Sequence, residues 1–401
     1  MTQPVAPADE AGIAAVVAEA AAANEPLAIQ GNATKRAMLR PVQAARTLST
    51  ANLRGITLYS PKELVLRARA GTPLPEIKAA LAENGQHLIA EPPDLSALFG
   101  TSLPATLGGM VAANLSGPRR VAWGAMRDHV LGLRAVNGTG EVIHSGGRVL
   151  KNVTGLDLCK LLTGSHGTLA VITEITLKVL PAPEAMGTVV LPGLDAVAGV
   201  AALSAALGSP YSVSAAAWLP DEAAARVGFA GSVALARIEE FAPSVAYRTA
   251  RLRADLAGFG SAEILDDAAS RTLWRAVRDL APLPVLAEDA VWRVSVRPSA
   301  GPSVLAAVAP AGVRGYLDWG GGLVWLAGPA SEAAHQAICR AATAAGGTWT
   351  LFRGPEPLAA AVAVIPPEPP PLARIARGVK AAFDPRGILN PGRLYPGLAS
   401  V

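Results

Sequence analysis

Hydrophobic and polar positions follow two periodicities along the first 180 residues. Residues 64–71 form a run rich in leucine and valine that ends in glycine, a pattern typical of a strand leading into a turn. Residues 73–84 repeat apolar positions at helical spacing, and Gly85 follows where a helix commonly ends. Residues 130–144 hold two strand-like runs around an Asn-Gly-Thr-Gly turn and predict a hairpin. A β-branched run over 171–180 predicts the last strand of this region.

The pattern changes after residue 185. Apolar runs of strand length alternate there with alanine- and arginine-rich stretches of helix length. Strands are expected at residues 186–191, 211–219, 232–238, 291–296, 323–326 and 348–352, and the clearest helices at 244–257 and 332–345. This order predicts an α+β domain, built as an antiparallel sheet with helices on one face.

We therefore expect four parts in the chain. Residues 1–182 form a first domain and residues 183–354 a second, α+β domain. Residues 355–372 form a proline-rich linker, because seven prolines lie between positions 355 and 371. Residues 373–401 then return to pack on one of the two domains.

The composition narrows the class of protein. The chain has 401 residues, 51% of them hydrophobic, which is enough to bury the cores of more than one domain. Its 35 basic and 31 acidic residues give a net charge of only +4, and aromatic residues make up 4%. The sequence has no run of basic residues that could follow a nucleic-acid backbone and few aromatic residues on which bases could stack. Nucleic-acid binding is therefore not supported.

The sequence predicts a cytoplasmic protein. No apolar stretch reaches the 18 residues expected of a membrane span, and acidic residues stand where a signal peptide would carry basic ones. Docking onto a membrane complex stays open. Cys159 and Cys339 are too few for a four-cysteine iron–sulfur or zinc site and are expected to be buried and reduced. The five histidines are scattered, so no metal site is predicted.

Two segments of the first domain have the small and polar residues of ligand-binding loops. Residues 30–35 form a polar turn directly after an apolar run, without Walker A spacing. Residues 101–120 place Gly108 and Gly109 at the start of a short helix, followed by further small residues. Free N–H groups at such a helix start can hold a phosphate. Each segment taken alone is also explained as a tight turn.

Two later segments complete the set. Residues 154–174 run from a short helix through Gly-Ser-His-Gly into a strand. Their spacing does not fit the G-x-S-x-G nucleophile elbow, so His166 is interpreted as a structural loop residue. Residues 383–392 form a turn-rich terminal segment. No G-x-G-x-x-G motif opens a helix after a strand, which argues against a Rossmann nucleotide site.

In this order, the four segments resemble the p-cresol methylhydroxylase/vanillyl-alcohol-oxidase superfamily of FAD-binding flavoproteins. Within it, the chain is similar to the small flavin subunits of bacterial glycolate oxidases. The resemblance covers nearly the whole chain and is most specific in PATLGGMVAANLSGPRR and KNVTGLDLCKLLTGSHGTLAVITEITLKVLP. It implies an α+β fold: a FAD-binding domain of two α+β subdomains, an α+β cap domain facing the flavin ring, and a C-terminal segment that packs back on the FAD-binding domain.

The resemblance also implies which residues hold FAD. They fall in a first pyrophosphate loop, a second pyrophosphate loop, a segment beside the adenosine half, and a C-terminal position near the isoalloxazine. In that order they are Gly31, Asn32, Ala33, Thr34 and Lys35; Thr106, Leu107, Gly108, Gly109, Ala113, Asn114 and Gly117; Gly167, Thr168, Val171 and Ile172; and Asn390.

The chain departs from the superfamily pattern in the first loop. Ala33 stands where many members have a second glycine, which predicts a less free backbone and a looser hold on FAD. Members that attach FAD covalently use a histidine in or near this loop. The first histidine of this chain is His87, so a non-covalent FAD is expected.

A second departure concerns the chemistry. Stand-alone 2-hydroxyacid dehydrogenases of the superfamily carry paired histidines in the C-terminal half, whereas residues 185–401 contain only His335. That histidine is expected on an exposed helix face, so no catalytic base is assigned. Arg293, Arg297 and Arg353 are each able to bind a carboxylate, and the sequence does not choose among them.

The function implied by the resemblance is a FAD-binding redox subunit of a glycolate oxidase complex, which oxidises glycolate to glyoxylate. Its implied partners are a larger flavin subunit and an iron–sulfur subunit. Two alternatives stay open. One is a stand-alone FAD-dependent oxidoreductase of another small 2-hydroxy acid, and the other is a flavin-fold scaffold that does not turn over.

Overall fold

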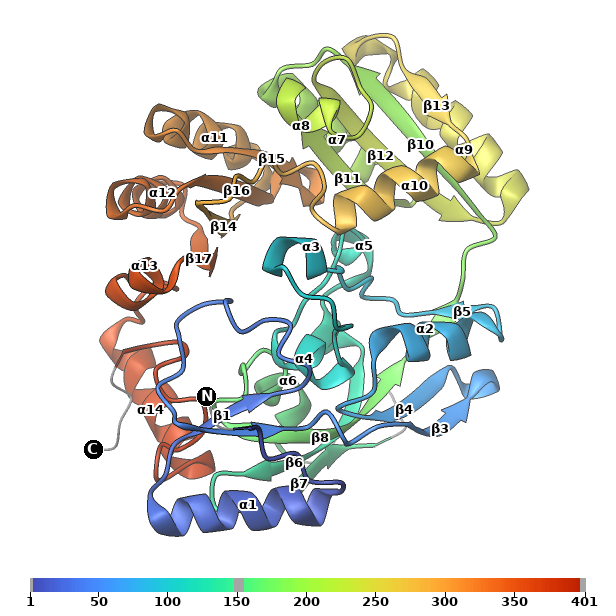
Figure 1. Ribbon diagram of the computed structural model, residues 1–401. Helices are drawn as coiled ribbons and strands as arrows, with labels where there is room; N and C mark the ends of the chain where they lie inside the picture. The colour runs from blue at the N-terminus through green and yellow to red at the C-terminus, as the bar shows by residue number, and fades with distance from the viewer. Residues whose placement is uncertain (1–2, 148–154, 397–401) are drawn as a thin grey trace. The chain divides into compact units, whose positions relative to one another are not determined.

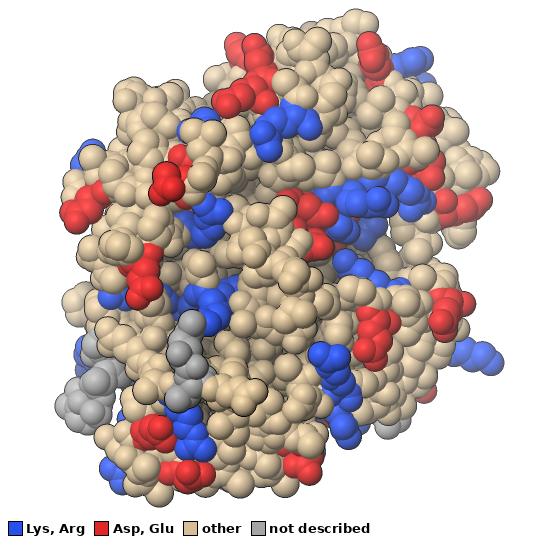
Figure 2. All heavy atoms as spheres, in the orientation of Figure 1, with Lys and Arg blue, Asp and Glu red and all other residues tan. Residues whose placement is uncertain are grey.

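The computed structural model describes residues 3–147 and 155–396. The first residue of the 154–174 segment and the last five residues of the C-terminal segment 373–401 lie outside this range. The chain divides into two compact units, which are drawn as ribbons in Figure 1 and as spheres with the charged residues coloured in Figure 2. Unit 1 comprises Met1–Leu115, Ala125–Ala182 and Pro367–Val401, and unit 2 comprises Ser116–Gly124 and Pro183–Pro366.

Unit 1 is built on an antiparallel sheet of order β3-β4-β8-β6-β7. Its strands are β3 Ile56–Ser60, β4 Val65–Arg69, β6 Val130–Asn137, β7 Val142–Gly146 and β8 Ala170–Lys178. Separate pairs are formed by β1 Leu27–Gln30 with β2 Arg46–Ser49, in parallel, and by β5 Gln86–His87 with β9 Leu180–Pro181. The helices are α1 Glu10–Ala23, α2 Leu74–Ala82, α3 Ser96–Phe99, α4 Leu107–Ala112, α6 Leu158–Leu162 and α14 Pro370–Phe383. The predicted hairpin at 130–144 is confirmed as β6–β7.

The two ends of the chain share one core in unit 1. Ile13 and Val17 of α1 pack with Leu27 of β1, Val171 of β8 and Leu389 of the C-terminal segment, and all are completely buried. Burying such side chains contributes roughly 1.5–3 kcal/mol each. This packing explains why the terminal segment returns to unit 1, as the resemblance implied.

Unit 2 contains an antiparallel sheet of order β13-β10-β12-β11-β15-β16-β14-β17. Its strands are β10 Ala185–Pro192, β11 Val213–Leu219, β12 Val233–Glu240, β13 Glu263–Leu265, β14 Asp289–Ser295, β15 Arg314–Asp318, β16 Leu323–Pro329 and β17 Thr348–Arg353. The helices are α5 Arg120–Trp123, α7 Ala196–Leu207, α8 Asp221–Ala225, α9 Ala242–Asp255, α10 Asp267–Arg278, α11 Gly301–Val308, α12 Glu332–Ala344 and α13 Glu356–Ala361. The sequence did not predict the short strands β13 and β15.

The register of the ladders assigns the helices to the two faces of this sheet, because paired residues point to the same side. Helices α7, α9, α11 and α12 pack on one face, where they contact Trp218, Gly187, Leu317 and Trp292, respectively. Helix α10 packs on the other face, where Trp274 donates to Thr188 Oγ1 at 3.0 Å. The prediction of helices on one face is therefore right for four helices and wrong for α10.

His335 of α12 is buried, not exposed as predicted. Its side chain is 5% exposed, its Nδ1 accepts a hydrogen bond from Trp292 Nε1 at 3.1 Å, and its ring stacks edge-on against Trp349. The helix is rich in alanine on all sides, so the sequence pattern did not distinguish the buried face. Of the two cysteines, Cys159 is buried and Cys339 is half-buried beside His335.

The proline-rich stretch 355–371, expected to form a linker, contains secondary structure. It holds helix α13, in which Leu358 and Ala359 are buried, and the first residues of α14. Both helices carry proline in the first turn, where the missing N–H costs no hydrogen bond. Among the described residues, no helix has the length and apolar run needed to cross a bilayer.

Candidate functional site

The turn after β1 presents a row of unpaired backbone donors. The N–H groups of residues 32–35 have no hydrogen-bond partner within the part of the chain that the structure describes. The Asn32 side chain donates to the carbonyl of Pro104 at 2.9 Å, which ties the turn to the segment before α4. Ala33 has a φ of 58°, a left-handed conformation that costs a residue with a Cβ about 1 kcal/mol or more. Successive N–H groups around such a residue form a concave anion-binding surface.

The start of α4 lies against this turn. A Cβ added to Gly31 would overlap Thr106 Oγ1, so the two segments are in direct contact. A Cβ on Gly109 would lie 3.4 Å from Lys35 Nζ. Among the described residues, the Gly109 N–H has one hydrogen-bond acceptor, Thr106 Oγ1, at a long distance of 3.4 Å. Gly109 therefore faces the turn and Lys35.

One part of the sequence interpretation is corrected here. The N–H groups of Leu107 and Gly108 are not free, since they donate to the carbonyls of Thr72 at 2.9 Å and Ala70 at 2.8 Å. A Cβ on Gly108 would lie 2.7 Å from the Ala70 Cβ. Gly108 is thus required for close packing against the segment after β4, and Gly109 is the glycine available to a ligand.

The loop before β8 and the C-terminal segment meet the same region. The N–H of His166 donates to the carbonyl of Ala112, at the end of α4, at 2.9 Å. Asn390 accepts from the Ile29 N–H through Oδ1 and donates to the His166 carbonyl through Nδ2, both at 2.7 Å. Asn390 thereby connects β1 to the loop, and the four segments singled out in the sequence come together.

Other residues of the carried-over set lie in the core of unit 1 or at the end of α4. Leu107, Val171 and Ile172 are buried in the core of unit 1. Ala113 ends α4, and the next residue, Asn114, accepts from the Arg127 N–H at 3.1 Å. These residues position the surrounding backbone.

Gly167, Thr168 and Gly117 complete the set. Gly167 has a φ of 70°, and a Cβ added to it would lie 2.8 Å from Asn390 Nδ2. The Thr168 carbonyl accepts a hydrogen bond from Lys380 Nζ of α14 at 2.6 Å, which fixes the loop before β8 to the C-terminal helix. Gly117 belongs to unit 2, where its carbonyl accepts from Trp319 Nε1 at 3.2 Å. The structure therefore does not group Gly117 with the other loop residues.

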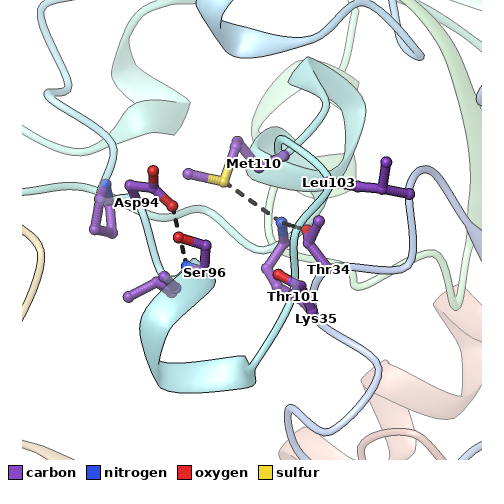
Figure 3. A pocket seen from close by; sticks show the side chains of 10 residues that line it. Thr34, Lys35, Asp94, Ser96, Thr101, Leu103 and Met110 are labelled. Atoms are coloured by element: carbon purple, nitrogen blue, oxygen red, sulfur yellow. Dashed lines mark hydrogen bonds between the residues drawn. The ribbon is translucent and has the colours of Figure 1, made fainter.

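A small, partly open pocket lies beside Lys35 (Figure 3). Its walls come from the first loop, from residues 93–96 at the start of α3, from residues 101–105 and from Met110 of α4. Lys35 Nζ lies 3.2 Å from Thr34 Oγ1 and 3.5 Å from Met110 Sδ. The Thr101 hydroxyl is buried without a partner among the described residues. The pocket thus combines a cation, an unsatisfied hydroxyl and apolar walls, as small-molecule sites do.

Basic groups dominate the electrostatics of this region. Burial, with repulsion from Arg393, lowers the pKa of Lys35 from 10.5 to about 8, although Asp94 opposes the shift. Burial alone lowers the pKa of Arg393 to about 10. Burial, with the charges of Arg393 and Lys35, lowers the pKa of His166 to about 3, so this imidazole is neutral at pH 7. The region is electropositive and favours a bound anion.

Sequence reasoning missed two contributors. Residues 93–96 line the pocket, but no motif in the sequence singled them out. Arg393 donates to the carbonyls of Lys35, Arg36 and Arg40 and holds the first loop in place. In the sequence, the only indication of this contact is that Arg393 closely follows Asn390.

Comparisons with known proteins define the class. Residues 3–146 match the family described as FAD binding domain. Over 97% or more of this chain, the fold is similar to those of 4-ethylphenol oxidase from Gulosibacter chungangensis and p-cresol methylhydroxylase. Each superposes with a TM-score of 0.72 at 14% identity and is covered over 89% and 88% of its own length, respectively. The fold is that of the p-cresol methylhydroxylase type, as the resemblance implied.

Sequence relatives narrow the class further. The chain is 36% identical to glycolate oxidase subunit GlcE of Escherichia coli over 381 residues, covering 93% of both chains. It is 40% identical to glycolate oxidase subunit GlcD of Bacillus subtilis over 97 residues, only 20% of that protein. The chain belongs to the family of glycolate oxidase subunit GlcE.

The residues present fit FAD. A dinucleotide with a central diphosphate needs N–H donors and positive charge at one point and an apolar-walled recess beside it. The unpaired donors of residues 32–35 and the Lys35 ammonium supply the first requirement. The pocket with the unpartnered Thr101 hydroxyl supplies the second.

Proposed function

We propose that this chain is the FAD-holding subunit of a glycolate-oxidising complex. The observation that carries the proposal is the 36% identity to subunit GlcE, which extends over 93% of both chains and so includes both units. A likeness confined to the FAD-binding part would leave the second unit unexplained.

In this proposal, different residues of unit 1 bind different parts of FAD. The turn of Asn32, Ala33 and Thr34 donates backbone N–H groups to the diphosphate, and Lys35 neutralises its charge. Gly109 leaves room for the diphosphate beside Lys35. The wall formed by Asp94–Ser96, Thr101 and Leu103 borders the recess for the rest of the cofactor.

Bound FAD supplies the acceptor for a hydride equivalent taken from the α-carbon of a hydroxy acid. The chain's own residues bind and orient that cofactor and exclude water around it. The reaction also needs a base for the hydroxyl proton. His335 is enclosed by Trp292 and Trp349, and the His166 backbone serves the loop. We therefore assign the base to a partner subunit.

The proposal includes two partners, a larger flavin subunit and an iron–sulfur subunit that receives the electrons. Two cysteines in this chain cannot build a four-thiolate cluster, so the onward electron path requires another protein. The complex would work at the cytoplasmic side, and attachment to the inner membrane would come through these partners.

Purification of the full chain with co-expressed partners tests the proposal. Flavin and iron are quantified in the isolated chain and in the complex, and turnover with glycolate is measured with a dye acceptor. We expect one FAD per chain, iron only in the complex, and turnover only in the complex. A chain that turns over alone is a stand-alone oxidoreductase, and a chain that assembles without flavin is a scaffold. Either result contradicts the proposal.

Acid precipitation tests the non-covalent attachment. The flavin is expected in the supernatant, because no histidine lies in the first loop. His166 is the histidine within electrostatic reach of Lys35, so His166→Ala is the matched variant. Flavin that stays with the precipitated wild-type chain, but not with His166→Ala, would replace the proposal with covalent attachment at His166.

A further inference from the structure

Arg293 lies in the sheet of unit 2, on the face opposite α12. In the register of β14, it pairs with Trp325 of β16 on one side and with Thr350 of β17 on the other. Its guanidinium lies 5.0 Å from the centre of the Trp319 ring and 5.9 Å from that of Trp325. The Arg293 side chain is therefore held between two indole rings on a rigid sheet.

Trp319, which forms one wall, is held in a strained conformation. Its φ is 53°, a left-handed conformation that a bulky residue rarely adopts. The Trp319 N–H donates to the Asp318 carboxylate at 2.7 Å, and its Nε1 donates to the Gly117 carbonyl at 3.2 Å. Arg120 stacks on the same ring at 4.7 Å. Strain of this kind persists where the surroundings fix one orientation, and such positions concentrate at ligand sites.

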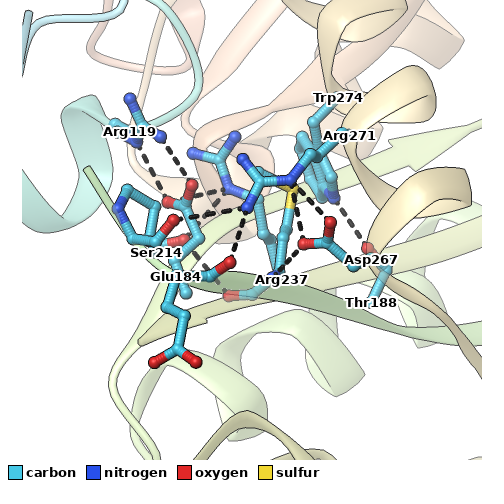
Figure 4. Close-up of polar contacts among 11 residues, drawn as sticks. Arg119, Glu184, Thr188, Ser214, Arg237, Asp267, Arg271 and Trp274 are labelled. Atoms are coloured by element: carbon cyan, nitrogen blue, oxygen red, sulfur yellow. Dashed lines mark hydrogen bonds and ion pairs between the residues drawn. The ribbon is translucent and has the colours of Figure 1, made fainter. Parts of the chain in front are cut away.

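The Arg293 guanidinium makes no hydrogen bond or ion pair with any residue in the described ranges 3–147 and 155–396. Two other buried arginines of unit 2, Arg119 and Arg237, are paired within the protein. Arg119 pairs with Glu239, and Arg237 pairs with Glu239 and with Ser214. Figure 4 labels Arg119, Arg237 and Ser214 in this cluster of polar contacts. A guanidinium carries five donors, so leaving all of them unused in a half-buried position is costly unless a ligand accepts them.

Charge selects the class of ligand. Arg120 and Asp318 are the charged groups that act on Arg293, and their opposite charges offset each other. The remaining single positive charge balances a monoanion better than a phosphate dianion. The planar guanidinium fork matches the two oxygens of a carboxylate.

We propose that Arg293, between Trp319 and Trp325, is a binding site for a small monocarboxylate such as glycolate. The inference rests on the proposed function, which places a 2-hydroxy acid in the same complex. It adds that unit 2 of this chain, and not only a partner, binds that acid through its carboxylate. The sequence alone did not show which of three arginines binds the carboxylate, and the structure favours Arg293. Arg297 is exposed, and Arg353 donates to the Asp289 carbonyl at 3.0 Å.

The test is a titration of the full-length FAD-loaded chain with sodium glycolate, followed by calorimetry and by tryptophan fluorescence at constant ionic strength. Both indoles adjoin the site, so binding should change the emission. Arg293→Gln should weaken glycolate binding by roughly tenfold or more, because a charge-assisted bidentate contact is lost. Arg293→Lys should bind with intermediate affinity, since a lysine keeps the charge without the fork.

Arg297→Gln is the matched control, because it removes an exposed arginine four positions away, and it should bind glycolate like the wild type. Flavin content and thermal midpoint are measured for each variant, so that loss of FAD is distinguished from loss of the carboxylate site. Inorganic phosphate is the second probe. Unchanged glycolate binding by Arg293→Gln, no saturable binding by the wild type, or tighter binding of phosphate than of glycolate would each overturn the proposal. None of these results would bear on FAD binding by unit 1.

Discussion

Asn390 Nδ2 donates a hydrogen bond to the carbonyl of His166 at 2.7 Å, across 224 positions of sequence. The same side chain accepts from the Ile29 N–H at 2.7 Å, and its backbone has a φ of 43°. Asparagine tolerates this left-handed conformation better than most residues. One amide therefore joins the strand before the first loop, the loop before β8 and the C-terminal segment.

Replacement of Asn390 by Asp should loosen this junction. The aspartate keeps an acceptor for Ile29 but sets a carboxylate against the His166 carbonyl, so a buried hydrogen bond becomes a repulsion. We expect a loss of roughly 1–3 kcal/mol in the free energy of unfolding and faster release of FAD. Thermal denaturation and flavin release after dilution measure the two effects. Wild-type stability in the variant would mean that the clamp contributes little.

Replacement of Ala33 by Gly should strengthen the site. Ala33 has a φ of 58°, where the Cβ is strained and glycine is not. We expect the free energy of unfolding to rise by up to about 1 kcal/mol and FAD to bind several-fold more tightly. Ala37→Gly is the control, since Ala37 is exposed in the same turn region and has no positive φ, and it should be neutral or destabilising. Calorimetric titration with FAD compares the two, and a weaker-binding Ala33→Gly would contradict the expectation.

The adjacent glycines of α4 should differ in effect. Gly109→Val should remove FAD while leaving most of the fold intact, because its side chain would extend toward Lys35. Gly108→Ala should instead destabilise the apoprotein by roughly 1–3 kcal/mol, since its Cβ would press on Ala70. Circular dichroism and flavin absorbance separate the two outcomes. Full flavin occupancy in Gly109→Val would show that the second loop is wrongly placed.

Lys35 should make FAD affinity depend on pH. Its pKa is lowered to about 8 in the folded chain, against 10.5 in an unperturbed lysine. Between these values the unfolded chain binds more protons, so this group makes the apoprotein more stable as the pH rises from about 8 toward 10.5. A diphosphate beside Lys35 favours the ammonium and raises its pKa again. FAD binding above pH 8 then takes up a proton, and affinity should fall by up to about tenfold per pH unit.

Titrations with FAD at pH 7, 8 and 9 check this expectation. Lys35→Met should bind FAD weakly and with little pH dependence. Lys62→Met is the control, because Lys62 is exposed in unit 1 and should leave the profile unchanged. A flat wild-type profile would mean that Lys35 does not meet the diphosphate.

The sequence was informative where local pattern determines structure. The hairpin of β6 and β7 has turn residues flanked by strand-forming runs, and α4 begins with a capping threonine before two glycines. It was less informative where distant residues decide. Burial of His335 of α12 depends on Trp292 and Trp349, which come from strands β14 and β17. Residues 93–96 become part of a binding pocket only because the fold places them opposite Lys35. Neither contact produces a periodic pattern of hydrophobic residues in the sequence.

His335 should be structural rather than catalytic. His335→Ala removes the acceptor of the Trp292 N–H and leaves a buried gap, so the free energy of unfolding should fall by roughly 2–4 kcal/mol. Turnover of the reconstituted complex with glycolate, measured well below the thermal midpoint and normalised to flavin content, should stay at the wild-type rate. A large loss of rate in the folded variant would require a catalytic role.

The FAD-loaded chain without partners should oxidise glycolate slowly or not at all. The oxidation requires a base for the hydroxyl proton, a cation for the carboxylate, and a flavin in position for hydride transfer. The chain supplies FAD-binding loops and, by our inference, the cation Arg293. Histidine is the usual base near neutral pH, and the one histidine after residue 185 is buried against two tryptophans. Steady-state turnover with glycolate and a dye acceptor is compared between the lone chain and the complex at equal flavin concentration. If the lone chain matches the complex, the base is in this chain, and the chain is an independent oxidoreductase.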